Sequence, residues 1–136
     1  MKPAPGHLRT RADHATELAE DYVEAIDDFI RSNGVCRSAD LVTRFGVTHA
    51  SVSNTVARLQ RDGFATTAPY RPIELTDVGR ELAAQSRKRH AVVHDFLLAI
   101  GVSEATAEID SEGMEHHVSD ETLRMMKLFL REQADG

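Results

Sequence analysis

Residues 38–59 read SADLVTRFGVTHASVSNTVARL, and this stretch decides the fold. Its first half places apolar side chains at helical spacing and ends at Gly46, a residue suited to the left-handed conformation that terminates helices. Thr48 then serves as the N-cap of a second helix, whose apolar face carries Val52, Val56 and Leu59. Two short helices joined by a glycine-containing turn are typical of a helix-turn-helix, although any packed pair of short helices can share this pattern.

The polar face of the second helix is suited to the major groove of DNA. Ala50, Ser51 and Asn54 have short side chains that let a helix approach base edges, and an asparagine amide can pair with adenine. We therefore predict DNA contacts from this helix and its cap, at Thr48, His49, Ala50, Ser51, Asn54 and Arg58.

Two short β-prone segments follow this helix, at residues 64–67 and 73–76, on either side of a proline-rich tip. This pattern predicts a two-stranded hairpin. Behind a recognition helix, such a hairpin is the wing of a winged helix-turn-helix domain. Arg71 at the tip is then placed to contact a phosphate or the minor groove, although a solvated loop arginine explains it almost as well.

Upstream of this motif, residues 1–16 contain two prolines and few large apolar groups, which predicts a flexible arm. Residues 17–33 have the periodicity of an amphipathic helix, with a plausible cap at Gly34. Its polar face carries Asp21 and Glu24, which are three residues apart and therefore adjacent. Taken alone, these two carboxylates are ordinary surface acids.

Downstream, Thr76 caps a predicted helix of about 25 residues that ends near Gly101. At 1.5 Å per residue it is nearly 40 Å long, more than a small domain needs, so it must connect two parts of the chain. Ser103 and Ser119 open two further helices with much apolar surface, which favours a dimerisation domain. The predicted domains are the arm, a DNA-binding domain at 17–80 and a helical metal-binding and dimerisation domain at 81–136.

A short acidic and histidine-rich run, EGMEHH at residues 112–117, lies in the first of these two helices. In a helix, Glu112, Glu115 and His116 project from one face, because they are three and four residues apart. They form half of a metal site that needs further ligands from elsewhere in the fold. The alternative is a solvated helical face, the commoner origin of charged runs.

Composition limits the class of protein. The 136 residues include one cysteine, Cys36, which excludes an internal disulfide and reads as a buried small hydrophobe. No apolar stretch is long enough to span a bilayer and no leader is evident, so we expect a cytoplasmic protein without a membrane partner. The net charge is −6, yet residues 31–90 carry ten Lys and Arg against five Asp and Glu. A basic middle between acidic ends favours DNA binding in the middle and cation binding at the ends.

Four motifs together identify a family: DYVE at 21–24, RH at 89–90, IGV at 100–102 and EGMEHH at 112–117. Over residues 17–130 the chain resembles the manganese-responsive regulators of the diphtheria toxin repressor family. The resemblance implies a mainly α protein, in which a long helix joins an N-terminal winged helix-turn-helix domain to a small all-α dimerisation domain. It also implies a metal-ligand set, namely Asp21, Glu24, His90, Glu112, Glu115 and His116.

The chemistry of this set agrees with the resemblance. Four carboxylates and two imidazoles without a thiolate suit octahedral Mn²⁺ better than zinc or copper. Four negative charges exceed what one divalent ion requires, so we expect two Mn²⁺ per subunit. Fe²⁺, Co²⁺ and Cd²⁺ are alternatives, because affinity alone does not sort divalent metals.

We therefore expect a transcriptional regulator and not an enzyme: a metal-activated repressor of manganese uptake genes that binds palindromic double-stranded DNA as a homodimer. One alternative is a winged-helix regulator that responds to iron or to a small organic ligand. A di-metal carboxylate enzyme is a second alternative, but such enzymes repeat Glu-x-x-His on two helices and this sequence holds no second copy.

Overall fold

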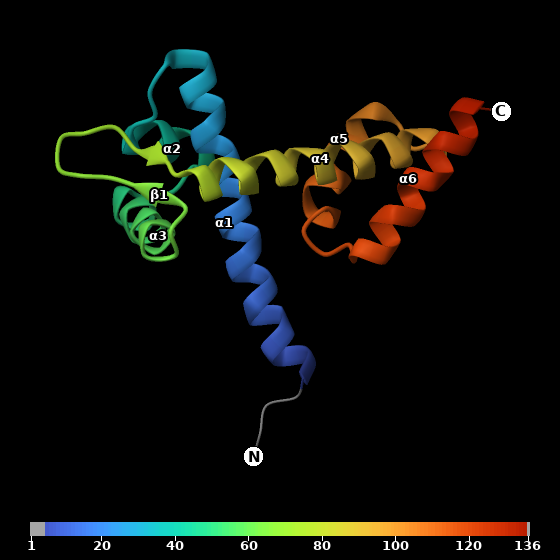
Figure 1. The fold of residues 1–136 in the computed structure, drawn as a ribbon, viewed down its shortest axis with the longest axis horizontal. Coiled ribbons are helices and arrows are strands. Elements are labelled where there is room, and N and C mark those ends of the chain that lie inside the picture. Colours follow the sequence, from blue (N-terminus) through green and yellow to red (C-terminus); the bar gives the residue numbers. More distant parts are fainter. Residues whose placement is uncertain (1–4, 136) are drawn as a thin grey trace. The chain divides into compact units, whose positions relative to one another are not determined.

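The computed structural model describes the backbone of residues 5–135 and the side chains of residues 16–135. Six helices and a two-stranded sheet follow one another along the described chain (Figure 1). Their order is α1 (Pro5–Asn33), α2 (Ser38–Phe45), α3 (His49–Arg61), β1 (Ala65–Thr66), β2 (Glu74–Leu75), α4 (Asp77–Ala99), α5 (Glu104–Met114) and α6 (Asp120–Asp135). The expected mainly α fold with a small hairpin is confirmed.

The chain divides into two compact units, and each has its own hydrophobic core. One unit comprises residues 14–85, and the other comprises residues 86–136 with the first residues of the chain. The division falls within α4, after Gln85, so this helix contributes to both units. The predicted boundary at 80/81 also lies within α4.

In the unit of residues 14–85, α2 and α3 form the predicted helix-turn-helix. Gly46 ends α2 with φ 63°, in the left-handed region that glycine adopts without strain, and donates to the carbonyl of Val42. The Thr48 hydroxyl accepts from the Ser51 amide at 3.0 Å, which caps α3 as predicted. Apolar side chains of α1, α2, α3 and the sheet share one core, including Val23, Ile26, Leu41, Val52, Leu59 and Leu75.

The hairpin that follows α3 is short. β1 and β2 pair antiparallel through Ala65 with Leu75 and Thr66 with Glu74. The Ile73 amide also donates to the Cys36 carbonyl at 2.8 Å, which ties the hairpin to the segment between α1 and α2. Tyr70 at the tip has φ 65° and is fully exposed beside Arg71, as expected for a wing.

In the other unit, the C-terminal part of α4 packs with α5 and α6 (Figure 1). Its core contains Val93, Leu97, Ala107, Leu123 and Met126. Phe96 and Phe129 meet edge to face, with ring centroids 5.4 Å apart. Among the described residues, no helix is long and apolar enough to cross a bilayer.

Two boundaries differ from the sequence-based expectation. The flexible arm was predicted over residues 1–16, but α1 begins at Pro5, and residues 1–4 lie outside the described residues. Proline is compatible with the first turn of a helix, where its missing N–H would have no intrahelical partner, so it starts α1 and does not prevent it. The helix expected to hold residues 112–117 ends at Met114, and residues 115–117 form a turn.

Cys36 is fully buried, and burial followed by the nearby charge of Asp40 raises the pKa of its thiol to about 12. At pH 8 the thiol therefore stays protonated, and only the thiolate is nucleophilic. We expect the native protein to react with a disulfide reagent such as DTNB at least about 100-fold more slowly than the urea-unfolded chain. Absorbance at the released thionitrobenzoate band measures both rates, and equal rates would contradict a buried thiol.

Candidate metal centre and DNA-binding surface

The buried carboxylate of Glu115 lies between two imidazoles. Its side chain is 5% exposed, with one oxygen 3.0 Å from Nδ1 of His90 and the other 3.3 Å from Nε2 of His116. His90 comes from α4, whereas Glu115 and His116 come from the turn that follows α5. The fold of this unit therefore brings together three of the six predicted ligands.

These contacts fit a hard divalent cation. Adjacent ligand atoms of an octahedral ion at 2.0 to 2.2 Å are separated by about 3 Å, which is the spacing of the carboxylate oxygens and imidazole nitrogens here. An imidazole nitrogen binds metal as the neutral base, and a carboxylate binds as the anion. His90, Glu115 and His116 thus provide nitrogen and oxygen donors of the kind that Mn²⁺ accepts.

The other three predicted ligands are placed differently. Glu112 is exposed on α5, one helical turn before Glu115. Asp21 and Glu24 lie on α1 in the unit of residues 14–85, where both are partly buried. The predicted set therefore draws on both units.

A second group of candidate ligands was missed by the sequence reasoning. The Nε2 atom of His94 lies 3.0 Å from Glu104 and 3.5 Å from Glu108, and these three residues offer ligand atoms within 4.8 Å of one another. Burial lowers the pKa of His94, but hydrogen bonding and charge from Glu104, with Asp95 and Glu108, raise it more, so the net pKa is above its ordinary value. The available signal was the four-residue spacing of Glu104 and Glu108 and of His90 and His94.

The predicted DNA-contacting residues are all exposed to solvent. The six predicted residues of α3 and its cap are all exposed, namely Thr48, His49, Ala50, Ser51, Asn54 and Arg58. The opposite side of α3 buries Val52, Val56 and Leu59 in the core, which fixes the orientation of the polar face. Arg71 is exposed on the wing.

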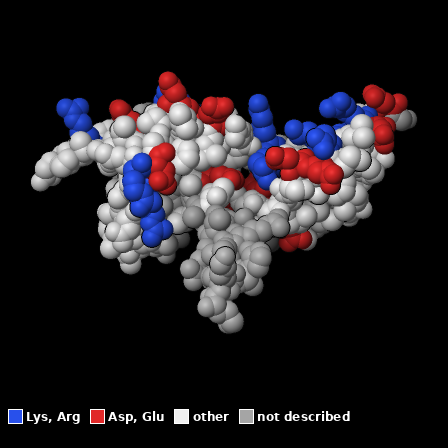
Figure 2. All heavy atoms as spheres, turned by 60° about the horizontal axis from the view of Figure 1, so that its bottom comes forward, with Lys and Arg blue, Asp and Glu red and all other residues white. Residues whose placement is uncertain are grey.

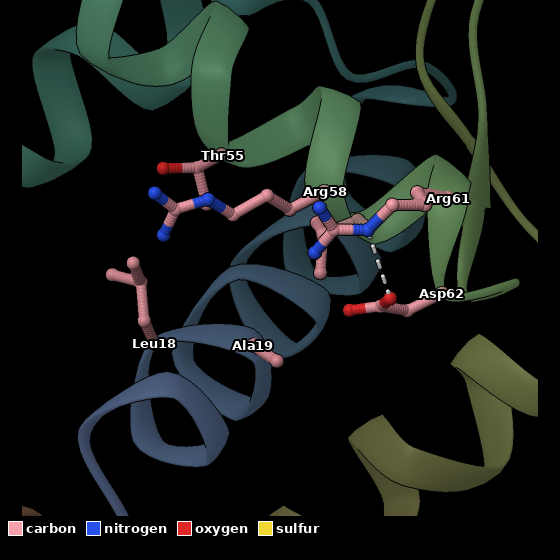
Figure 3. Close-up of a pocket in the computed structure, with 7 residues that line it drawn as sticks. Leu18, Ala19, Thr55, Arg58, Arg61 and Asp62 are labelled. Carbon is pink, nitrogen blue, oxygen red and sulfur yellow. Dashed lines mark hydrogen bonds and ion pairs between the residues drawn. The ribbon is translucent and has the colours of Figure 1, made fainter. Parts of the chain in front are cut away.

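Arg61, which the sequence reasoning did not select, lies beside Arg58 at the end of α3. Both arginines line a pocket of about 320 Å³ that also includes Leu18 and Ala19 of α1. Figure 3 shows the two guanidinium groups extending over this turn of α1, with Arg61 paired to Asp62 at 3.3 Å. If α3 contacts DNA as predicted, these two cations at its C-terminal end are suited to DNA phosphates.

Charge alone does not mark a DNA-binding face. In the view of Figure 2, Lys and Arg side chains stand beside Asp and Glu side chains and form no continuous basic field.

Two protein-family models match the chain, one over its N-terminal part and one over its C-terminal part. Residues 14–73 match the model described as iron dependent repressor, N-terminal DNA binding domain, and residues 76–134 match iron dependent repressor, metal binding and dimerisation domain. The chain belongs to the iron-dependent repressor family. Membership confirms the resemblance to the diphtheria toxin repressor family and the two-domain fold expected from it. This member of the family is a DNA-binding transcriptional regulator with a metal-binding and dimerisation domain.

Curated relatives are similar over most of their length. The transcriptional regulator MntR of Escherichia coli O6:H1 (strain CFT073) is 45% identical over 124 residues, which cover 91% of this chain and 80% of that protein. The HTH-type transcriptional regulator MntR of Geobacillus kaustophilus (strain HTA426) is 36% identical over 104 residues, covering 76% of this chain and 74% of that protein.

Solved structures share the fold. A manganese-dependent transcriptional repressor in complex with manganese superposes with a TM-score of 0.74 at 26% identity, over 82% of this chain. This chain spans only 52% of that protein's chain. The hypothetical protein SSo2273 of Sulfolobus solfataricus has a TM-score of 0.67 at 19% identity, covering 82% and 85% of the two chains, a likeness of fold alone.

Proposed function

We propose that this regulator is a manganese-activated repressor of manganese uptake genes, which binds palindromic operators as a homodimer in the cytoplasm. The observation that carries the proposal is the contact of the Glu115 carboxylate with His90 and His116 inside the metal-binding and dimerisation domain. The solved manganese-dependent repressor in complex with manganese, at 26% identity, supports manganese as the metal, and the relatives at 45% and 36% identity are both regulators named MntR.

We propose that Asp21, Glu24, His90, Glu112, Glu115 and His116 hold the metal. Mn²⁺, when bound, supplies positive charge and an octahedral set of coordination positions. The proposed ligands bring four carboxylates, which suits two ions per subunit better than one. The group of His94, Glu104 and Glu108 is a further place where an ion of such a pair can bind. Fe²⁺, Co²⁺ and Cd²⁺ remain alternatives that a titration must rank.

The proposed ligands explain how metal controls DNA binding. Asp21 and Glu24 belong to the DNA-binding unit, whereas the other four ligands belong to the dimerisation unit. Without a cation, six such groups brought together would repel through their carboxylates, which disfavours a single arrangement of the two units. With these acids neutralised, one arrangement is favoured, and the two recognition helices of a dimer are held about 34 to 36 Å apart for a palindrome.

On the DNA side, we propose contacts from α3 and the wing. Ser51 and Asn54 face base edges, and Arg58 and Arg71 face phosphates or the minor groove. Thr48, His49 and Ala50 complete the surface at the start of α3. In this arrangement the protein performs no turnover, and its output is occupancy of the operator.

The test is a metal titration of DNA binding. A duplex is selected from a random pool by the Mn²⁺-loaded protein, sequenced, and labelled for fluorescence anisotropy with MnCl₂ or with EDTA. Coupling of about 1 to 3 kcal/mol predicts roughly 5- to 150-fold tighter binding with manganese. Equal affinity in MnCl₂ and EDTA would remove the metal-activated mechanism and favour a regulator of an organic ligand. Parallel titrations with Fe²⁺ under anaerobic conditions and with Zn²⁺ rank the metals.

Two further measurements address the finer parts of the proposal. Elemental analysis of the desalted, manganese-saturated dimer should give two ions per subunit, and one ion per subunit would contradict that count. The Mn²⁺-loaded protein should not consume oxygen or peroxide beyond the rate of free Mn²⁺. Sustained consumption would favour the di-metal enzyme.

A further inference from the structure

Arg89 connects α4 to the turn that carries two of the proposed ligands. Its Nε donates to the carbonyl oxygen of Glu115 at 3.1 Å, and one terminal nitrogen donates to the carbonyl oxygen of Val118 at 2.5 Å. Its other terminal nitrogen lies 3.5 Å from Asp120, whose carboxylate is almost fully exposed. The guanidinium group thus spans the connection between α5 and α6.

Both carbonyls are positioned to need such a donor. Glu115 follows the last residue of α5 and Val118 precedes α6, so both oxygens lie outside the regular helical bonding pattern. The C-terminal end of a helix also carries partial negative charge, which a guanidinium stabilises. Because Arg89 binds on either side of His116, it fixes the backbone from which that imidazole projects.

The residue after Arg89 is His90, whose ring contacts the Glu115 carboxylate at 3.0 Å. Two consecutive residues of α4 therefore hold Glu115 by its backbone and by its side chain. The contact through Arg89 involves no ligand atom and needs no metal. Groups that orient ligands in this way typically change metal affinity by about 10- to 100-fold when they are removed.

We infer that Arg89 is a positioning residue of the metal centre, which presets the Glu115–Val118 turn so that the Glu115 carboxylate meets both His90 and His116 before the ion binds. The inference rests on the proposed function, since it concerns the same metal centre. The guanidinium group must donate to both backbone carbonyl oxygens, those of Glu115 and Val118. Neither the positive charge alone nor the ion pair with Asp120 can replace these two hydrogen bonds.

The experiment is isothermal titration of MnCl₂ into the metal-free dimer of the 136-residue chain. Arg89→Gln is expected to bind Mn²⁺ about 10- to 100-fold more weakly than the wild type. Arg89→Lys keeps the charge but cannot form both carbonyl bonds, so an intermediate loss is expected. Lys88→Gln removes the same charge from the neighbouring exposed position of α4, and Asp120→Asn removes only the ion pair. Both of these variants should stay within about twofold of the wild type.

Thermal unfolding in EDTA separates positioning from general stability. Mn²⁺ affinities are compared at a temperature well below the melting temperature of every variant, where all of them are folded. A substitution that only lowered the stability of the fold would leave the affinity for Mn²⁺ unchanged under these conditions. Wild-type affinity in both Arg89 variants would overturn the inference. If Arg89→Gln fails to fold, Arg89→Lys decides by the same criterion. A wild-type protein that binds no Mn²⁺ would instead contradict the proposed function.

Discussion

Glu115→Gln is expected to abolish the response of DNA binding to manganese, with at least about a 100-fold loss of Mn²⁺ affinity. The substitution preserves the size of the side chain but replaces an anionic oxygen with an amide nitrogen that cannot bind a cation. Glu115 touches both His90 and His116, so its charge lies at the centre of the described ligand cluster. Removing a ligand should lower the affinity for Mn²⁺ more than removing a group that orients the ligand, which lowers metal affinity by about 10- to 100-fold.

The measurement combines MnCl₂ titration by calorimetry with anisotropy of the labelled operator. Glu132→Gln is the matched control, because it removes an equal charge from an exposed position of α6 in the same unit. The control should keep the wild-type response. A manganese response retained by Glu115→Gln would show that this carboxylate is not a ligand, whatever the metal proves to be.

Gly79→Ala is expected to destabilise the DNA-binding unit by about 3 kcal/mol. A Cβ atom at Gly79 would lie 2.0 Å from the carbonyl oxygen of Phe64 and 2.9 Å from its carbonyl carbon, and both are backbone atoms with little freedom to move. The same carbonyl, which directly precedes β1, accepts from the amide of Thr76, the residue before α4, at 3.0 Å. Relieving the clash therefore displaces the start of α4 from the hairpin.

Gly113→Ala is the matched control for this prediction. An added Cβ at Gly113 meets no atom within 4 Å, and the residue lies inside α5, where alanine is the better helix former. Its free energy of unfolding should rise by about 0.5 to 1 kcal/mol. Urea unfolding followed by circular dichroism measures both variants in EDTA. Equal stabilities would mean that α4 does not pack against Phe64 in this way.

The local features of the DNA-binding unit could be predicted because they depend on neighbouring residues. Thr48 caps α3 through an amide three residues away, and Gly46 ends α2 through its own backbone angle. The burial of Val52 and Val56 follows from helical spacing alone. The start of α1 at Pro5 was missed, because prolines were read as breakers when one of them begins the helix.

By itself, the sequence determined the succession of helices and hairpin, the polar face of α3 and a clustered run of carboxylates and imidazoles, since each depends on spacing within one segment. Only the tertiary structure decided that Glu115 contacts His90 and that Arg89 donates to the turn after α5. It also decided that Glu104 and Glu108 lie beside His94, and that the backbone of Phe64 leaves no space for a side chain at residue 79. These contacts join residues of separate elements. Their distances depend on how the helices pack, and a periodic pattern along one helix carries no information about that.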